Sequence, residues 1–181
     1  MKVKECLLLA GELLGLDGAI TDLNSGSSKS EETQTLLRCF QLVQSELALD
    51  YLPLFAEDEV ETETGAVFFS ELTYPPVRIL KITDKIGGEL DFTLFPEYVK
   101  TEAGKLKVRY TYAPIEKTIG DECDCALGVS ARLVAYGVAS EYALAVGLYE
   151  EANVWEKKYK DAISAVYRLK RAKPIKSRRW V

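Results

Sequence analysis

The sequence has 181 residues, of which 48% are hydrophobic and 28% are charged, with a formal net charge of −5 and no histidine. This apolar content excludes a disordered chain and is sufficient for one domain with a sizeable core. The absence of histidine excludes His-dependent catalytic triads and His-ligated metal sites.

The charge is distributed unevenly along the chain. Residues 170–181 contain six basic residues and no acidic one, whereas the rest has 17 basic and 28 acidic residues, a formal charge of −11. A general DNA-binding domain concentrates positive charge on one face, so this balance disfavours that class. We expect an acidic body that repels phosphate and a basic tail that docks on an acidic partner.

We expect neither a signal peptide nor a membrane span. The charged residues near the start precede only a modest apolar run, and no small-residue cleavage site follows it. The longest apolar stretch, 126–149, contains Arg132 and Glu141. Each would cost roughly 2.5–3.5 kcal/mol near the centre of a bilayer.

Two helices are predicted in the first third of the chain. Apolar residues at three- and four-residue spacing predict a helix over 2–15, which two glycines end. Ser28 fits a capping box for the next helix, and Ser30 is the competing N-cap. This second helix runs to about Leu52, because Pro53 stops it.

The middle of the sequence predicts a small antiparallel sheet of four or five strands. The acidic run at 57–63 is expected to be a solvated connection, and beyond it the hydrophobic period becomes two. Tyr110 and Tyr112 share one face of the last strand, where we expect core or interface residues in preference to a ligand platform. The predicted strands are 66–72, 77–83, 90–94, 98–101 and 106–112.

Two further helices follow the sheet. The segment 126–148 is apolar nearly all round and rich in small residues, so we expect it at the centre of a bundle or at a subunit interface. The segment 150–169 is amphipathic, and Glu150 and Glu151 at its start complement the helix dipole. The residues expected in helix packing or a subunit interface are Arg132, Gly137, Glu141, Tyr142, Trp155 and Tyr159.

This order of elements predicts an α+β fold. Residues 1–56 and 115–169 would form one discontinuous helical bundle, because neither pair of helices could bury its apolar stripe alone. Residues 57–114 would form an inserted antiparallel β block. Residues 170–181 would form a basic C-terminal tail.

No group of residues has the pattern of a catalytic or cofactor site. The four cysteines lack the spacing of a zinc site, so we expect reduced thiols. The turn at Gly87 and Gly88 lacks the helix and lysine of a phosphate-binding loop. Glu141, a lone acid on an apolar helix, is expected in a structural ion pair rather than in catalysis. We expect a protein that is not an enzyme and that uses no cofactor and no metal.

Several segments together resemble a known family. They are YPPVRILKI at 74–82, VRYTYAP at 108–114, YGVASEY at 136–142 and GLYEEA at 147–152, followed by Trp155 and Tyr159. With the helix–sheet–helix order over roughly 30–170, they resemble the head–tail connector, or adaptor, proteins of tailed bacteriophages. The helical finish is similar to the gatekeeper or tail-tubular branch of that group.

The resemblance implies a structural virion protein that does no chemistry. Such adaptors form a ring of about twelve subunits below the portal, around the channel through which DNA leaves the head. The implied partners are the portal protein, a tail or stopper protein and further copies of the chain, while DNA passes through without specific binding. The implied location is the head–tail junction of the virion, and the host cytoplasm before assembly.

Under this resemblance, the basic tail is a portal-docking arm with Trp180 as its aromatic anchor. From the residues alone, a solvated chain end and a nucleic-acid-binding arm remain alternatives. For the whole protein the alternatives are another non-catalytic phage morphogenesis or bacterial interaction protein, or a small-molecule enzyme or binder with a pocket near Glu141. The residues assigned to the docking arm are Arg168, Lys170, Arg171, Lys173, Lys176, Arg178, Arg179 and Trp180.

Overall fold

The computed structural model describes residues 1–26 and 29–171 and has the predicted α+β fold. The chain divides into two compact units. The helical unit contains Met1–Val43, Lys117–Cys123 and the described chain from Leu127 onward. The β unit contains Gln44–Glu116 and Asp124–Ala126, and therefore begins earlier than residue 57.

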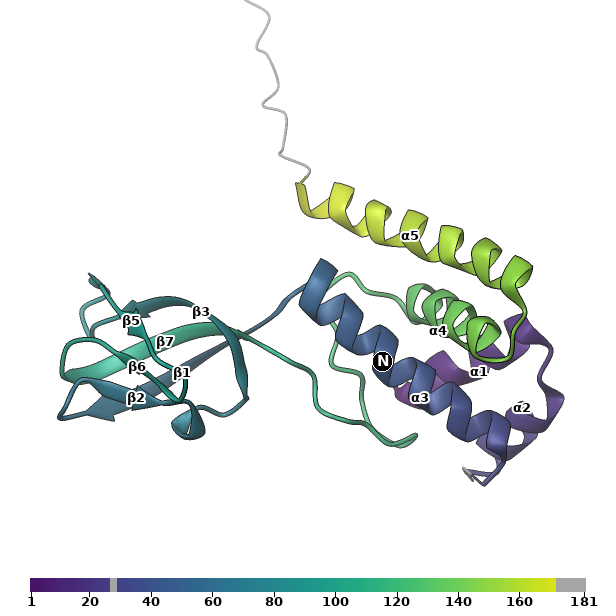
Figure 1. Ribbon diagram of the computed structural model, residues 1–181, viewed down its shortest axis with the longest axis horizontal. Helices are drawn as coiled ribbons and strands as arrows, with labels where there is room; N and C mark the ends of the chain where they lie inside the picture. Colours follow the sequence, from purple (N-terminus) through teal and green to yellow (C-terminus); the bar gives the residue numbers. More distant parts are fainter. Residues whose placement is uncertain (27–28, 172–181) are drawn as a thin grey trace, which may run out of the picture. The chain divides into compact units, whose positions relative to one another are not determined.

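Of the five α-helices in the described residues, four match the predicted ones in kind and place, and one was not predicted. Gly15 ends α1 in the left-handed conformation, with φ of 68°. Gly18, expected to help end that helix, instead lies inside the short helix α2. The helices are α1 (Val3–Leu14), α2 (Asp17–Asn24), α3 (Glu31–Glu46), α4 (Ala131–Ala145) and α5 (Tyr149–Arg171), and a π-helical turn (Leu47–Tyr51) follows α3 (Figure 1).

Serine hydroxyls cap two of these helices. The Thr33 N–H donates to Ser30 Oγ at 3.1 Å, so Ser30 is the N-cap of α3. The Leu133 N–H donates to Ser130 Oγ at 3.2 Å, so α4 begins later than residue 126. The preceding loop contains Gly128 with φ of 95°, a conformation that a helix cannot include.

Helix α4 lies at the centre of the helical unit, packed against α1 and α5 (Figure 1). Nine of its 15 residues are buried, including most of the small ones. The Ser140 hydroxyl, also buried, donates to the Ala152 carbonyl of α5 at 3.2 Å. Core residues come from α1 (Leu7, Ala10), α3 (Leu36, Phe40, Val43), α4 (Val134, Val138) and α5 (Tyr159, Ile163, Val166).

The β unit contains two antiparallel sheets, so the prediction of a single sheet was wrong. One sheet has the order β1-β7-β3-β4 and the other β2-β6-β5. The acidic run expected to be a connection is the edge strand β1, and the predicted strand at 90–94 is split between the two sheets. The strands are β1 (Leu54–Thr62), β2 (Ala66–Phe68), β3 (Pro76–Thr83), β4 (Glu89–Leu90), β5 (Thr93–Leu94), β6 (Tyr98–Lys100) and β7 (Gly104–Tyr112) (Figure 1).

The two sheets share one hydrophobic core. Val67 of β2 and Val99 of β6 contribute from the smaller sheet, and both are fully buried. The larger sheet contributes alternate residues of β7 and two isoleucines of β3. Because the inner faces pack together, the opposite face of the larger sheet carries the charged and exposed side chains. The members of this core are Val67, Leu72, Ile79, Ile82, Val99, Leu106, Val108 and Tyr110.

Candidate interaction surface

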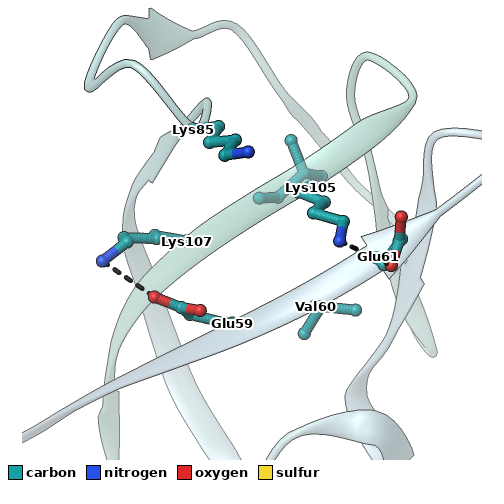
Figure 2. A pocket seen from close by; sticks show the side chains of 7 residues that line it. Glu59, Val60, Glu61, Lys85, Lys105 and Lys107 are labelled. Carbon is teal, nitrogen blue, oxygen red and sulfur yellow. Dashed lines mark ion pairs between the residues drawn. The ribbon is translucent and has the colours of Figure 1, made fainter.

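The outer face of the larger sheet carries a ladder of opposite charges between β1 and β7. Glu59 pairs across the strands with Lys107, and Glu61 pairs with Lys105. The Nζ–Oε distances are 2.9 Å for Lys107–Glu59 and 3.5 Å for Lys105–Glu61 (Figure 2). The hydrogen bond between Glu59 and Lys107 lowers the pKa of the Glu59 carboxyl group and raises the pKa of the Lys107 ammonium group. Since these pairs are exposed, they stabilise the sheet little and chiefly fix its register.

A wide hollow of about 490 Å³ lies over this ladder. Figure 2 shows Lys85, which comes from the turn after β3, beside the two ion pairs. Carboxylates already hold two of the three lysines that line the hollow, so positive charge is not concentrated there for an anion. We therefore assign the hollow no ligand.

A second hollow in the β unit, of about 220 Å³, is walled largely by apolar side chains. Phe55 is 55% exposed and Val77 is 54% exposed, high values for large apolar residues. Monomeric proteins rarely expose large contiguous apolar patches, and such patches commonly mark interaction sites. We call the four residues Leu49, Phe55, Val77 and Leu80 the apolar patch; Ala48, Pro53, Arg78, Thr111 and Tyr112 complete the lining.

Two irregularities in β3 explain the exposure of two patch residues, Val77 and Leu80. The register against β7 shifts between Pro76 and Arg78 and again between Ile79 and Lys81. Each shift adds a residue to β3, as a β-bulge does, and interrupts the alternation of buried and exposed positions. Because of these shifts, Val77 and Leu80 are exposed although the sequence predicted regular alternation.

On the inner side of the same sheet, a hydrogen-bond network holds the loop before β3. The Tyr110 hydroxyl donates to Asp58 Oδ2 at 2.7 Å and accepts from the Tyr74 N–H at 3.2 Å. Asp58 also accepts from the N–H and hydroxyl of Thr73, at 2.6 and 3.0 Å. Tyr112 stacks on Tyr74, with ring centres 4.3 Å apart. Tyr110 and Tyr112 therefore take part in the packing of the β unit.

The network shifts the pKa of both acidic groups. Burial, and then the neighbouring Asp58 carboxylate, raises the pKa of Tyr110 to about 12. Burial raises the pKa of Asp58, but the hydrogen bonds from Thr73 and Tyr110 outweigh it and leave that pKa below its ordinary value. The arrangement thus favours a neutral phenol beside a charged carboxylate, which is a structural hydrogen bond.

Several residues predicted for helix packing do meet in the helical unit. Gly137 is buried where α4 meets Val43 of α3 and Tyr159 of α5. Tyr142 and Tyr159 are buried as well. Trp155 is partly exposed and stacks on Tyr136, with ring centres 5.9 Å apart.

Arg132 and Glu141 have surroundings that the sequence did not predict. Arg132 is exposed, and its Nε donates to the Tyr136 hydroxyl at 2.7 Å. Glu141 is half-buried, and within the described part of the chain no lysine or arginine lies at ion-pair distance from it. The predicted structural ion pair is therefore not found among the described residues. A half-buried carboxylate needs no such partner, since its exposed part can be hydrated. After burial itself, the charge of Glu141 helps to raise the pKa of the Cys39 thiol to about 11.

The helical unit has an apolar surface of its own at the turn between α4 and α5. Tyr149 at the start of α5 is two-thirds exposed, and the neighbouring Leu148 is nearly half exposed. A shallow hollow of about 330 Å³ lies here, with Glu150 and Glu151 at its rim. The exposed apolar residues of this corner are Leu144, Val146, Leu148, Tyr149 and Val154.

The predicted docking arm falls mostly outside the described residues. Arg168 lies in the last turns of α5 and is exposed. The helix continues through Lys170 and Arg171. The remaining residues of the predicted arm lie outside the part of the chain that the structure describes, so its role stays a prediction. They are Lys173, Lys176, Arg178, Arg179 and Trp180.

Two comparisons of the sequence, with protein families and with curated proteins, found no match.

Within residues 1–26 and 29–171, no three His, Cys, Asp or Glu side chains gather as a metal site would require. No helix in this same part of the chain is long and apolar enough to cross a bilayer.

Sequence reasoning missed the apolar patch and the charge ladder. The ladder had a signal: Glu57, Glu59 and Glu61 recur with period two, as do Lys105, Lys107 and Arg109. The apolar patch had no such signal in the sequence. Leu49 and Phe55 lie on either side of a proline, and the exposure of Val77 and Leu80 depends on the register shifts of β3.

Proposed function

We propose that this protein is a structural component of a tailed-bacteriophage particle, a head–tail connector that forms a ring of about twelve copies below the portal. Its partners would be the portal protein, a tail or stopper protein and neighbouring copies of itself. DNA would pass through the ring without specific binding. The protein would do no chemistry and would act at the head–tail junction, after synthesis in the host cytoplasm.

The observation that carries this proposal is the apolar patch of the β unit. Phe55, Val77 and Leu80 are exposed on a sheet face that otherwise carries mainly charged residues, and Leu49 of the π-helical turn lines the same hollow. Burial of exposed apolar surface is the main driving force for protein association, at roughly 25 cal/mol per Å². A patch with a polar rim therefore fits a protein–protein contact better than a site for a small polar ligand.

Two further features support an assembly around DNA. The helical unit presents a separate apolar corner between α4 and α5, so a subunit would have more than one surface for neighbours. A ring needs two different surfaces on each subunit, because its contacts are head-to-tail. Outside residues 170–181 acidic residues outnumber basic ones, and a negatively charged channel wall would repel the DNA phosphates and let the DNA pass. The identity of the particle comes from the sequence resemblance alone.

The proposal is tested by measuring association with the portal protein encoded in the same genome. Sedimentation velocity of the mixture should show the chain bound to the portal in multiple copies. Phe55→Glu places a charge in the apolar patch, and it should weaken this binding at least tenfold while leaving the melting temperature unchanged. No association of the unaltered chain would instead favour a non-catalytic interaction protein of another kind.

Ile86 offers a matched control for that variant. It is 95% exposed on the turn before β4, in the same unit as Phe55 and outside the patch. Ile86→Glu therefore adds the same charge at another exposed apolar position. It should bind the portal as the unaltered chain does. Equal loss of binding in both variants would show that added charge is responsible and would remove the patch from the proposal.

A further inference from the structure

The start of the chain is held by a returning segment, residues 117–123, which we call the strap. The Val3 N–H donates to the Asp121 carbonyl at 3.0 Å. The Cys123 N–H donates to the Met1 carbonyl, also at 3.0 Å. The strap thus lies along the first turn of α1, within the helical unit.

Two cysteines face each other across this junction. The Sγ atoms of Cys6 and Cys123 are 3.8 Å apart. A disulfide bond is about 2.05 Å long, so the two atoms need to approach by roughly 1.8 Å. Cys6 is fully buried on α1, whereas Cys123 lies on the irregular strap and is partly exposed. Cys123 can therefore meet a reagent from solvent and turn toward Cys6.

We propose that Cys6 and Cys123 form a disulfide when the protein meets a small disulfide such as oxidised glutathione. The Cys123 thiolate attacks one sulfur of the glutathione disulfide and releases one glutathione thiolate. The Cys6 thiolate then attacks the Cys123 sulfur of the mixed disulfide and releases the second glutathione thiolate. Two cysteine thiols are oxidised, one glutathione disulfide is reduced to two glutathione molecules, and the two protons pass to them.

The bond would close a long loop. Cys6 and Cys123 are 117 positions apart in sequence, and the main part of the β unit, Gln44–Glu116, lies between them. A cross-link that closes a long loop removes much conformational freedom from the unfolded chain. The disulfide would therefore fasten the segment through which the chain returns from the β unit to the first helix of the helical unit.

The other two cysteines provide internal controls. Cys39 is buried on α3, and burial followed by the charge of Glu141 raises its pKa to about 11, which keeps it protonated and unreactive. Cys125 is only two residues from Cys123 and is also partly exposed. A comparison of Cys125 with Cys123 therefore distinguishes the effect of the short Cys6–Cys123 distance from the effect of solvent exposure alone.

The timing of this step rests on the proposed function, whereas its chemistry does not. Thiols stay reduced in a cytoplasm, and disulfides persist outside cells and on virions. A connector would thus be assembled as the dithiol and fastened after the particle is released. Because the chemistry can be measured on the isolated protein, its failure is distinguishable from failure of the connector proposal.

The test treats the reduced full-length protein with oxidised glutathione, blocks the remaining thiols and identifies cross-linked peptides by mass spectrometry without reduction. The expected product joins Cys6 to Cys123, and the melting temperature should rise by about 5 °C or more over the reduced protein. Glutathione that stays on Cys123 with no link to Cys6 would overturn the proposal.

Two single substitutions complete the test. Cys125→Ser should leave both the cross-link and the rise in melting temperature unchanged. Cys123→Ser should abolish both, and its partly exposed position makes it a mild change to the fold. A cross-link between Cys6 and Cys125 in the Cys123→Ser variant, with the same rise in melting temperature, would show that the 3.8 Å approach has no special role.

Discussion

Gly137 and Val43 lie so close that a Cβ atom on Gly137 would be 2.7 Å from Val43 Cγ1. The same atom would be 2.9 Å from Cε2 of Tyr159. Packed carbon atoms sit at about 3.5–4.0 Å, so α4 can meet α3 and α5 here only because this residue has no side chain. The contact gives a physical reason for one of the small residues that the sequence places along α4.

Larger residues at position 137 should destabilise the helical unit in order of size. Gly137→Leu should lower stability by about 3 kcal/mol or more, because the added carbons must displace two buried side chains. In Gly137→Ala the clash of one methyl group is partly offset by alanine's better helix propensity, about 1 kcal/mol. Thermal denaturation followed by circular dichroism measures both. Gly120→Ala is the control, since nothing lies within 4 Å of a Cβ atom at that position. A Gly137→Leu variant as stable as the unaltered protein would contradict this packing.

Removal of the Tyr110 hydroxyl should destabilise the β unit. Tyr110→Phe takes one hydrogen-bond donor from Asp58 and the acceptor from the Tyr74 N–H. Loss of a partner costs about 1–3 kcal/mol for fully buried polar groups, and because these two groups are partly buried we expect a cost of about 1 kcal/mol. Chemical denaturation should show this decrease, whereas Tyr98→Phe should be neutral because the described contacts of Tyr98 are made by its ring and backbone. Equal stability of the two variants would show that the network does not hold the loop.

The same tyrosine predicts a dependence of stability on alkaline pH. The folded protein raises the pKa of Tyr110 to about 12, above the value near 10 of an unfolded tyrosine. The folded state therefore binds this proton more tightly, and its stabilising effect is complete below about pH 10. It is lost as the pH rises toward 12. Denaturation midpoints measured from pH 8 to 12 should fall less steeply for Tyr110→Phe than for the unaltered protein; identical slopes would contradict this assignment.

Asp58 predicts the opposite dependence at acid pH. Its pKa is lower in the folded protein than in the unfolded chain, so its stabilising effect is present above about pH 4. The effect is lost as the pH falls through the lower folded value. Asp58→Asn should therefore flatten the fall in stability below pH 4, as measured by urea denaturation. An unchanged acid profile would show that Asp58 is not held by Thr73 and Tyr110 in solution.

The helices and most strands could be predicted because their apolar residues follow one clear period. Helix α5 shows this best, since Tyr159, Ile163 and Val166 recur at helical spacing and are buried together. The strand β7 likewise alternates, with Leu106 and Val108 facing the core. In such segments local pattern and tertiary burial agree.

Other features depended on partners distant in sequence. The part of β1 from residue 57 onward looked like a solvated connection because its exposed positions are glutamates, and the basic positions of β7 lie opposite them in the sheet. The patch residues Val77 and Leu80 face outward because of register shifts that alternation alone cannot reveal. The approach of Cys6 to Cys123 required knowing that the strap returns to α1.

Deletion of residues 170–181 should leave the fold intact. Among the residues of α5 up to Arg168, whose burial the structure describes, the last buried one is Val166, before the deletion begins. The melting temperature of the 1–169 chain should therefore stay within about 2 °C of the full-length value. A large fall would show that the deleted residues contribute to the core.

The most direct test of the connector proposal is to image the purified protein mixed with the portal protein of the same genome by negative-stain electron microscopy. Full-length and 1–169 chains are compared side by side. We predict an added ring of density on the portal with the full-length chain and its loss with the shortened one. No added density with either chain would contradict the connector proposal and leave the basic tail a solvated end.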